Sequence, residues 1–239
     1  MIMESKNRRG IFMREIKKTE PLHSQVYHIV KEMIMEGKYQ PGERLVETKV
    51  AENLGVSRGT VREAFRMLTK DDLLAQKENS LFVYDPEAQD ILDIYECRKS
   101  LESLSAKLAA QNIAAEQLDQ LEQIITESKK ALALPDTQEL TSLNQKFHDT
   151  IAFASRNKQL IQLFEVINAK VLYIRNCILK ERSESFAVLV NDHEEIFHAL
   201  KERDPAKAQE KMEAHIQRSL KVANAALNKQ MGDPESSLG

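Results

Sequence analysis

The sequence predicts a mainly α-helical protein, with an N-terminal winged helix-turn-helix domain and a C-terminal antiparallel all-helical bundle. Residues 47–66, ETKVAENLGVSRGTVREAFR, predict the first domain because they have the spacing of two short helices joined by a tight turn. Two short strand patterns follow directly, as expected for a wing. The strand signals end at Asp85-Pro86, and helical periodicity then continues almost without glycine until Gly232, which predicts the bundle.

Composition limits the class of protein. The chain has 239 residues, enough for one or two domains, and 42% hydrophobic residues can form real cores. The chain has 30% charged residues and no apolar run near 18 residues, so we expect no membrane-spanning helix. Its N-terminus lacks the apolar region of a secretory signal, and we expect no interaction with a membrane. Cys97 and Cys177 are far apart and not in a metal-type spacing, so we expect both to be reduced and buried in a cytoplasmic protein.

Charge is distributed unevenly along the chain. Residues 1–84 contain 15 Lys and Arg against 12 Asp and Glu, a net charge of +3. Residues 85–239 contain 19 against 25, a net charge of −6. A basic front half and an acidic back half favour a DNA-binding head joined to a body that does not bind DNA.

Shifts in composition also set the domain boundaries. We expect a flexible arm at 1–20, the winged helix-turn-helix domain at 21–85, the helical domain at 86–231 and a flexible tail at 232–239. The arm has six basic residues against three acids. A disordered extension and an arm that contacts DNA phosphates are the two alternatives for it.

Each element of the first domain has a local signal. In order, the sequence predicts a helix at 22–37, a turn at 39–42, the helix-turn-helix, and strands at 73–76 and 80–84. Gly55 lies where the chain must turn with φ > 0, and Ser57 is suited to cap the second helix of the motif. A hairpin directly after that helix is typical of a wing.

The second helix of the motif carries the face that reads DNA in this type of domain. Arg58, Thr60, Arg62 and Arg66 crowd that face, and such side chains contact phosphates and base edges in a major groove. Lys77, at the predicted wing tip, can reach a phosphate or the minor groove. The alternative is an ordinary helical hairpin, which the concentration of basic residues disfavours.

The second domain is predicted to be helical throughout. Helices are indicated at 87–112, 116–133, 137–155, 158–180, 185–202 and 205–230. Asp204-Pro205 is typical of a helix start, and Leu134-Pro135-Asp136 predicts a break. About 145 residues of antiparallel helices with short connections can enclose a pocket.

Histidines in the bundle form a candidate metal site. Asn144 and His148 are four residues apart on one predicted helix and are therefore neighbours, while His193 and His215 lie on two later helices. Three imidazoles from three helices can converge on one metal ion, with Asn144 or water completing the set. On spacing alone, solvated or capping histidines are the alternative. His193 and His198 nearly form the HExxH of zinc proteases, but their separation of five residues places them on different faces.

PGERL at 41–45 and LGVSRGTVREAF at 54–65 make residues 21–84 resemble the DNA-binding domain of GntR-type bacterial transcription regulators. The resemblance implies operator contacts at Arg58, Thr60 and Arg62, with Ser57 and Gly59 beside them. Gly59 replaces a side chain that family members often use. The wing is also about one residue short and lacks the usual tip glycine, so the operator sequence is left open.

The bundle resembles the FCD domain, the effector-binding half of FadR-type GntR regulators. The matching motifs are DIYECRKSLESLSAKLAA at 93–110, NQKFHDTI at 144–151, DHEEIFHAL at 192–200 and AKAQEKMEAHI at 206–216. In metal-binding members the ligands are three histidines and an aspartate, which implies His148, His193 and His215, with Asn144 in place of the aspartate. An amide oxygen can still bind a metal, but one negative charge is lost. By analogy only, Arg98, Arg175 and Asn176 are expected to line the same cavity.

Together these features predict a ligand-responsive regulator that binds double-stranded DNA, with repression as the commoner behaviour of the resembling family. We expect a homodimer on a palindromic operator, a divalent metal (zinc, or alternatively nickel) and a small carboxylate effector, which a positively charged metal site favours. One alternative is a metal-dependent enzyme or binder with an incidental helix-turn-helix, for which no general base is evident. The other is a DNA-architectural protein with a purely structural bundle.

Overall fold

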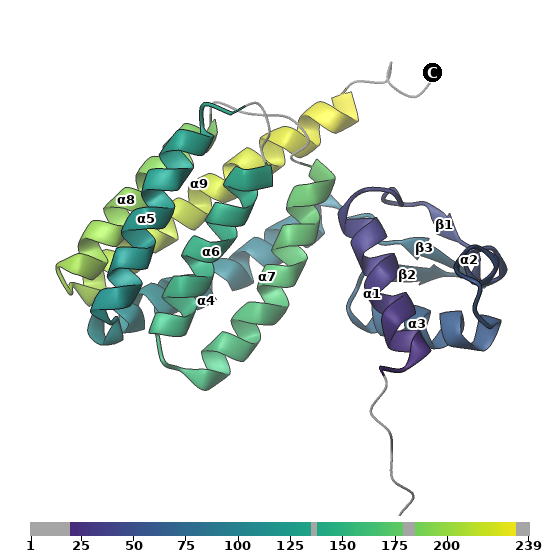
Figure 1. The fold of residues 1–239 in the computed structure, drawn as a ribbon. Coiled ribbons are helices and arrows are strands. Elements are labelled where there is room, and N and C mark those ends of the chain that lie inside the picture. Colours follow the sequence, from purple (N-terminus) through teal and green to yellow (C-terminus); the bar gives the residue numbers. More distant parts are fainter. Residues whose placement is uncertain (1–19, 135–137, 179–184, 233–239) are drawn as a thin grey trace, which may run out of the picture.

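The computed structural model describes residues 20–134, 138–178 and 185–232. They form a small head and a helical bundle, seen beside each other in Figure 1. The head contains α1 (Leu22–Met35), β1 (Arg44–Leu45), α2 (Glu47–Leu54), α3 (Arg58–Lys70), β2 (Leu74–Lys77) and β3 (Ser80–Val83). The bundle contains α4 (Ala88–Asn112), α5 (Ala115–Ala131), α6 (Gln138–Ala154), α7 (Lys158–Ile178), α8 (Ser185–Lys201) and α9 (Pro205–Gly232). The predicted fold class is confirmed. Most of the expected arm and tail, and the predicted break at 135–136, lie outside the described residues.

The helix-turn-helix forms from the local signals in its sequence. Gly55 ends α2 in the left-handed conformation with φ of 65°, and the backbone N–H of Thr60 donates a hydrogen bond to Ser57 Oγ over 3.2 Å at the start of α3. The apolar sides of α1, α2 and α3 enclose one core, in which Val61 and Leu68 are fully buried. This packing holds α3 with its polar side facing outward.

The wing contains a strand that the sequence pattern did not predict. The antiparallel order is β1-β3-β2, with Arg44 opposite Phe82 and Lys77 opposite Ser80. β1 has two residues, too few to produce a periodic pattern. At the turn between β2 and β3, Glu78 takes the left-handed conformation with φ of 56°. Glycine adopts this conformation without steric strain, but this wing turns with a glutamate in its place.

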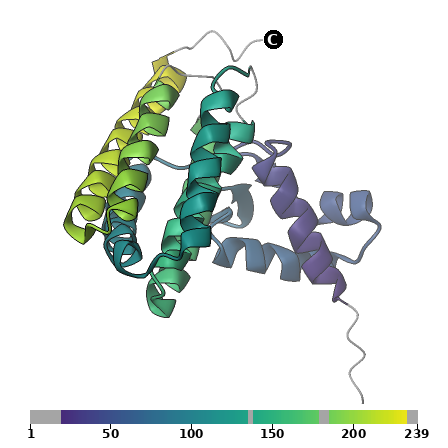
Figure 2. The same cartoon turned by 60° about the vertical axis from the view of Figure 1, so that its left-hand side comes forward.

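The bundle core lies between α4, α9 and the helices around them. α9 packs along α4 and beside α8, and the two views show α8 and α9 running side by side (Figure 1 and Figure 2). Ala106 and Ala109 of α4 are fully buried, and their small side chains allow neighbouring helices to approach closely. α9 starts at Pro205, where Asp204 Oδ1 accepts the backbone N–H of Lys207 over 3.0 Å.

Helix α7 joins the bundle to the head. The ring of Tyr173 is buried in the hydrophobic core of the head, and its hydroxyl donates a hydrogen bond to the backbone carbonyl of Tyr84, just after β3. Lys170, one turn earlier on α7, forms an ion pair with Asp72 of the head. Helix α7 of the bundle is therefore in direct contact with the head.

Two other expectations concern the cysteines and the membrane. The expectation that both cysteines are buried is wrong for Cys97, which is exposed because it lies on the outer side of α4, and Cys177 is half-buried. Within the described ranges, no helix combines the length and apolar character needed to cross a bilayer.

Candidate metal and effector site and DNA-facing surface

Three helices of the bundle bring three histidines together. His148 comes from α6, His193 from α8 and His215 from α9, and all three are buried. One ligand atom from each ring lies within 4.8 Å of the others. The helical periodicity that places Phe147 and Ile151 in the core also turns His148 inward. The three predicted ligands therefore converge, whereas His198 is exposed on α8.

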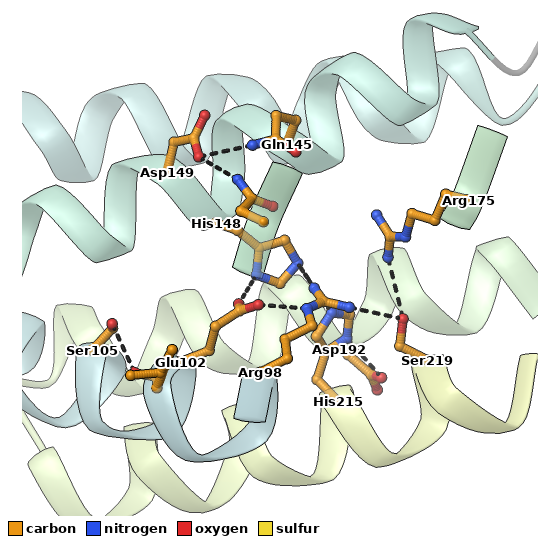
Figure 3. Close-up of polar contacts among 12 residues, drawn as sticks. Arg98, Glu102, Ser105, Gln145, His148, Asp149, Arg175, Asp192, His215 and Ser219 are labelled. Atoms are coloured by element: carbon orange, nitrogen blue, oxygen red, sulfur yellow. Dashed lines mark hydrogen bonds and ion pairs between the residues drawn. The ribbon is translucent and has the colours of Figure 1, made fainter. Parts of the chain in front are cut away.

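Two carboxylates orient two of these rings (Figure 3). Glu102 on α4 contacts Nδ1 of His148, and Oδ2 of Asp192 lies 3.3 Å from Nδ1 of His215. A carboxylate accepts a hydrogen bond only from a protonated Nδ1, so we assign each ring the tautomer with a lone pair on Nε2. The two Nε2 atoms lie 3.3 Å apart. Two unprotonated nitrogens cannot hydrogen-bond to each other, so a cation bound to both would stabilise this pair.

His193 provides the test of whether the residues fit a metal. Its side chain is 2% exposed, and neither ring nitrogen has a hydrogen-bond partner in the part of the chain that is described. The ring stacks on Phe147 with centroids 3.9 Å apart. A buried imidazole without partners is costly, and a divalent ion shared with His148 and His215 would satisfy one of its two nitrogens. The donor set fits such an ion.

Burial sets the charge state of the cluster. It lowers the pKa of His148 to about 3, although the neighbouring Glu102 acts in the opposite direction, and it lowers the pKa values of His193 and His215 as well. Burial alone would raise the pKa of Glu102, but Arg98 and His148 hold it well below its ordinary value. At neutral pH the site therefore contains three neutral imidazoles, the form that binds metals, beside an ionised carboxylate.

Arg98, which was expected by analogy to line the cavity, contacts the histidine cluster but is not among the residues that line the adjoining pocket. Its side chain is 2% exposed and forms an ion pair with Glu102, one turn later on α4. Its Nη2 is 3.2 Å from Nε2 of His148, and its Nη1 donates to Ser219 Oγ over 3.4 Å. A metal ion bound to His148 would have to replace the contact between Arg98 and that nitrogen.

Arg175 is the second buried arginine. It projects from α7 and donates from Nη2 to Ser219 Oγ over 3.2 Å (Figure 3). Its Nε lacks a hydrogen-bond partner, and among the described residues no carboxylate forms an ion pair with it. Burial and the nearby Arg98 lower the pKa of Arg175. Two arginines against one Glu102 carboxylate leave the cluster positively charged before any metal binds.

A small pocket with a volume of about 30 Å³ opens beside the cluster. Asn144, Arg175 and His193 line it together, so the predicted fourth ligand faces the same space as one of the histidines. The expectation that Asn176 lines this cavity is wrong. Asn176 is exposed and donates from Nδ2 to the backbone carbonyl of Met35 over 3.1 Å, because the next residue on α7 after Arg175 points toward the head.

Several residues of the cluster were not predicted. Glu102 lies four residues after Arg98, and Ser219 lies four residues after His215, so the neighbour spacing of a helix could have found both. Asp192 is different because it supports His215, on another helix, and is itself held by two contacts of 2.7 Å from Arg218. No spacing along the sequence reveals that pairing.

The predicted DNA-contacting residues lie on α3 and the wing. Arg58, Arg62 and Arg66 are exposed on α3, Thr60 is half-exposed, and Lys77 is exposed at the end of β2. This arrangement leaves the basic face of α3 open to a major groove and sets Lys77 beside it on the wing.

Two other predicted positions, Ser57 and Gly59, lie at the start of α3. Ser57 caps α3 through its hydroxyl. Gly59 is helical, and a Cβ there would meet Ser57 Oγ at 3.7 Å, an ordinary contact. A side chain would therefore fit at Gly59, and the backbone does not require glycine there.

Glu47 is a residue of this surface that was not predicted. It lies in the first turn of α2 and accepts Nε of Arg62 at 3.0 Å and Nη2 of Arg62 at 2.9 Å, and it is 3.7 Å from Arg58. This side-on pairing leaves the outer edge of the Arg62 guanidinium free, which is the edge that pairs with guanine. Attraction to Arg62 lowers the pKa of Glu47.

An exposed basic recognition helix, a wing and a buried ligand cluster define a DNA-binding transcription regulator with an effector-binding domain. Residues 22–83 match the family described as bacterial regulatory proteins, gntR family, and residues 93–218 match the FCD domain. The chain therefore belongs to the GntR family of regulators that carry an FCD domain. The families that it matches and the relatives named below are transcription regulators.

Comparisons with individual proteins agree. The chain is 35% identical over 207 residues to the uncharacterized HTH-type transcriptional regulator YdhC of Bacillus subtilis (strain 168), covering 84% of this chain and 91% of the relative. It is 24% identical over 186 residues to the gluconate operon transcriptional repressor of the same strain, covering 76% of each. The solved structure of E. coli McbR/YncC shares the fold, with a TM-score of 0.72, 20% identity and coverage of 87% and 100%.

Proposed function

We propose that this regulator is a repressor whose FCD domain binds a divalent metal and a small carboxylate, and that the carboxylate changes its affinity for an operator. The observation that supports this most is the buried cluster of three neutral histidines beside an arginine without a carboxylate partner. A purely structural core would have no use for such groups, because burying them is costly unless a ligand compensates.

The metal ligands are His148, His193 and His215, with Asn144 as the fourth. Zinc suits imidazole donors, and nickel is the alternative. Because Asn144 is neutral where related sites have an aspartate, we expect weaker metal binding than in a site with a carboxylate. When bound, the metal supplies a divalent positive charge and an open coordination position for an anion.

The effector is recognised by charge. Arg175 has free hydrogen-bonding capacity at Nε and lines the pocket together with His193 and Asn144. A carboxylate there would pair with the guanidinium, and Arg98 would add to the positive field. Such a ligand would supply the carboxylate partner that Arg175 lacks, since Glu102 pairs with Arg98.

DNA recognition is assigned to a homodimer. Two copies of α3 would enter major grooves of a palindromic operator about one helical turn apart, roughly 34 Å. Arg58 and Arg62 would read bases, while Arg66 and Lys77 would contact phosphates. The named function of the gluconate operon repressor supports repression as the outcome.

The effector signal would pass through α7. Arg175 faces the pocket, whereas Tyr173 and Asn176 on the same helix contact the head. A ligand that draws Arg175 toward the metal would move the two head contacts with it. The heads would then have one arrangement with the ligand bound and another without it, and the two arrangements would differ in affinity for DNA. A ligand that binds one arrangement more tightly shifts the equilibrium toward it.

Gel shifts with an operator selected from a random duplex library test the proposal. The double variant that combines Arg58→Ala with Arg62→Ala should abolish specific binding while leaving the fold and the binding of acids intact. Arg175→Met should retain operator binding but lose the response to carboxylates. Operator affinity that survives both α3 substitutions would contradict the DNA assignment, and an unchanged response in Arg175→Met would contradict the effector assignment.

A further inference from the structure

The guanidinium group of Arg98 contacts the nitrogen of His148 that would bind a metal. Nη2 of Arg98 lies 3.2 Å from Nε2 of His148. Because Glu102 contacts Nδ1 of the same ring, we assign the proton to Nδ1 and the lone pair to Nε2. A guanidinium group has only donors, so Arg98 donates a hydrogen bond to this lone pair (Figure 3).

The two closest histidine nitrogens already have the spacing of zinc ligands. Two zinc–nitrogen bonds of about 2.0–2.1 Å at a tetrahedral angle hold their nitrogens about 3.3–3.4 Å apart. The Nε2 atoms of His148 and His215 are 3.3 Å apart, so zinc could bind both with little movement of these rings. The group that has to move is Arg98.

The guanidinium group and a metal ion exclude each other at His148. An unprotonated imidazole nitrogen has one lone pair, which can accept an N–H of Arg98 or bind a metal ion, but not both. An ion about 2.1 Å from Nε2 would lie well within the 3.2 Å between this atom and Nη2 of Arg98. The two positive charges would also repel each other strongly at such a separation. Metal binding therefore requires the guanidinium group to leave His148.

Leaving His148 has a cost for Arg98. Its Nε forms an ion pair with Glu102, and its Nη1 donates to Ser219 Oγ over 3.4 Å, so two further contacts hold the guanidinium group in place. The side chain is buried, and Nη2 would give up its hydrogen bond away from bulk water. Hydrogen bonds from a charged donor contribute more than those between neutral groups. Displacing Arg98 should therefore weaken metal binding measurably.

We propose that Arg98 is a built-in competitor of the metal, which lowers the metal affinity of the histidine site by holding the lone pair of His148. The inference rests on the metal site proposed above and adds how its affinity is controlled. Displacement of the guanidinium group weakens metal binding about 10- to 100-fold relative to the same histidines without Arg98. This effect adds to the missing charge at Asn144, so a higher concentration of free metal is needed to fill the site.

Competition for zinc between the full-length protein and a chromogenic chelator measures the affinity. Arg98→Met removes the guanidinium group and keeps a long side chain, so zinc should bind about 10- to 100-fold more tightly than to the wild type. Arg175→Met is the matched control. It removes the same charge from the same cluster, but Arg175 donates to Ser219 and, within the described ranges, is not hydrogen-bonded to a histidine. It should raise zinc affinity far less.

A second measurement needs no substitution at Arg98. Arg98 and Arg175 are the buried arginines of the described chain, so in protein labelled with ¹⁵N at arginine their side-chain protons should exchange most slowly with water. Arg175→Met removes one of these two signals and thereby assigns the other to Arg98. Saturating zinc should shift the Arg98 signal and speed its exchange, because its hydrogen bond to His148 is broken. An Arg98 signal that zinc leaves unchanged would overturn the inference.

The outcomes separate this inference from the function on which it rests. Equal zinc affinity in the wild type and in Arg98→Met, with both folded by circular dichroism, would overturn the competition but leave the metal site standing. An equal rise in Arg98→Met and Arg175→Met would show a general effect of charge and would also overturn it. Zinc binding in neither the wild type nor Arg98→Met would contradict the metal site itself.

Discussion

The head and the bundle each contain an arginine–glutamate ion pair, exposed to solvent in the head and buried in the bundle. On the head, Arg62 is exposed and Glu47 holds it side-on, so the outer edge of the guanidinium remains free for DNA. In the bundle, Arg98 and Glu102 are both buried and support His148. The exposed pair keeps its charge in water, with little desolvation cost, where DNA can reach it. The buried pair holds its charge in a low-dielectric interior, where the electrostatic interaction with a small ligand is stronger.

The largest effect should come from breaking the buried pair. Glu102→Gln removes the only carboxylate in contact with both Arg98 and His148 among the described residues, and it leaves a buried cation uncompensated. We expect the bundle to lose about 3–5 kcal/mol of unfolding free energy, measured by chemical denaturation. Glu63→Gln, which breaks the exposed pair with Arg66, is the control and should change stability little. Equal losses of unfolding free energy in the two variants would contradict the difference drawn between buried and exposed ion pairs.

Acid should weaken the bundle more than the head. The folded-state pKa values of His148, His193 and His215 lie below the value near 6.5 of an unfolded chain, so the unfolded state binds more protons at mildly acidic pH. Stability is therefore fully present above about pH 6.5 and falls on acidification, by up to about 1.4 kcal/mol per pH unit for each histidine. Denaturation of metal-free protein between pH 7.5 and pH 5.5 measures this slope. A flat profile would mean that the cluster is not buried in its neutral form.

Removing the exposed arginine should affect DNA and not the fold. Arg62→Ala is expected to lower affinity for a selected operator about 10- to 100-fold, because one bidentate base contact is lost. Fluorescence anisotropy with the operator and with an unrelated duplex distinguishes specific from general binding. A melting temperature close to that of the wild type is the control, since the side chain of Arg62 is about half exposed (49%) and an exposed ion pair adds little stability.

The smallest predicted effect concerns Glu47. In Glu47→Gln the guanidinium of Arg62 loses its fixed orientation, and one negative charge leaves the DNA-facing surface. We expect the ratio of specific to non-specific affinity to fall several-fold, while non-specific binding stays equal or rises. Preserved specificity would show that Arg62 is oriented by DNA alone and that Glu47 is not a positioning residue.

Much of the fold could be predicted because its signals are local. The turn at Gly55, the cap at Ser57 and the start of α9 at Pro205 each depend on a few neighbouring residues. β1 could not be predicted, because two residues carry no period and the strand exists only by pairing with β3.

The candidate site was also only partly predictable, because some of its contacts join residues on different helices. The three histidines were identified by resemblance, but the carboxylates behind them depend on how helices pack. Asp192 supports His215 on another helix, although it is adjacent in sequence to His193. Asn176 was misplaced because adjacent helical residues point in different directions, so Arg175 faces the pocket while Asn176 faces the head.

The metal content of protein purified without a histidine tag tests the central claim most directly. His193→Ala removes a buried ligand of the cluster, and His198→Ala makes the same change at an exposed position on the same helix. After equilibration with zinc and desalting, elemental analysis should find about one equivalent in the wild type and in His198→Ala, and almost none in His193→Ala. Equal metal in all three proteins, or none in the wild type, would contradict a metal site formed by His148, His193 and His215.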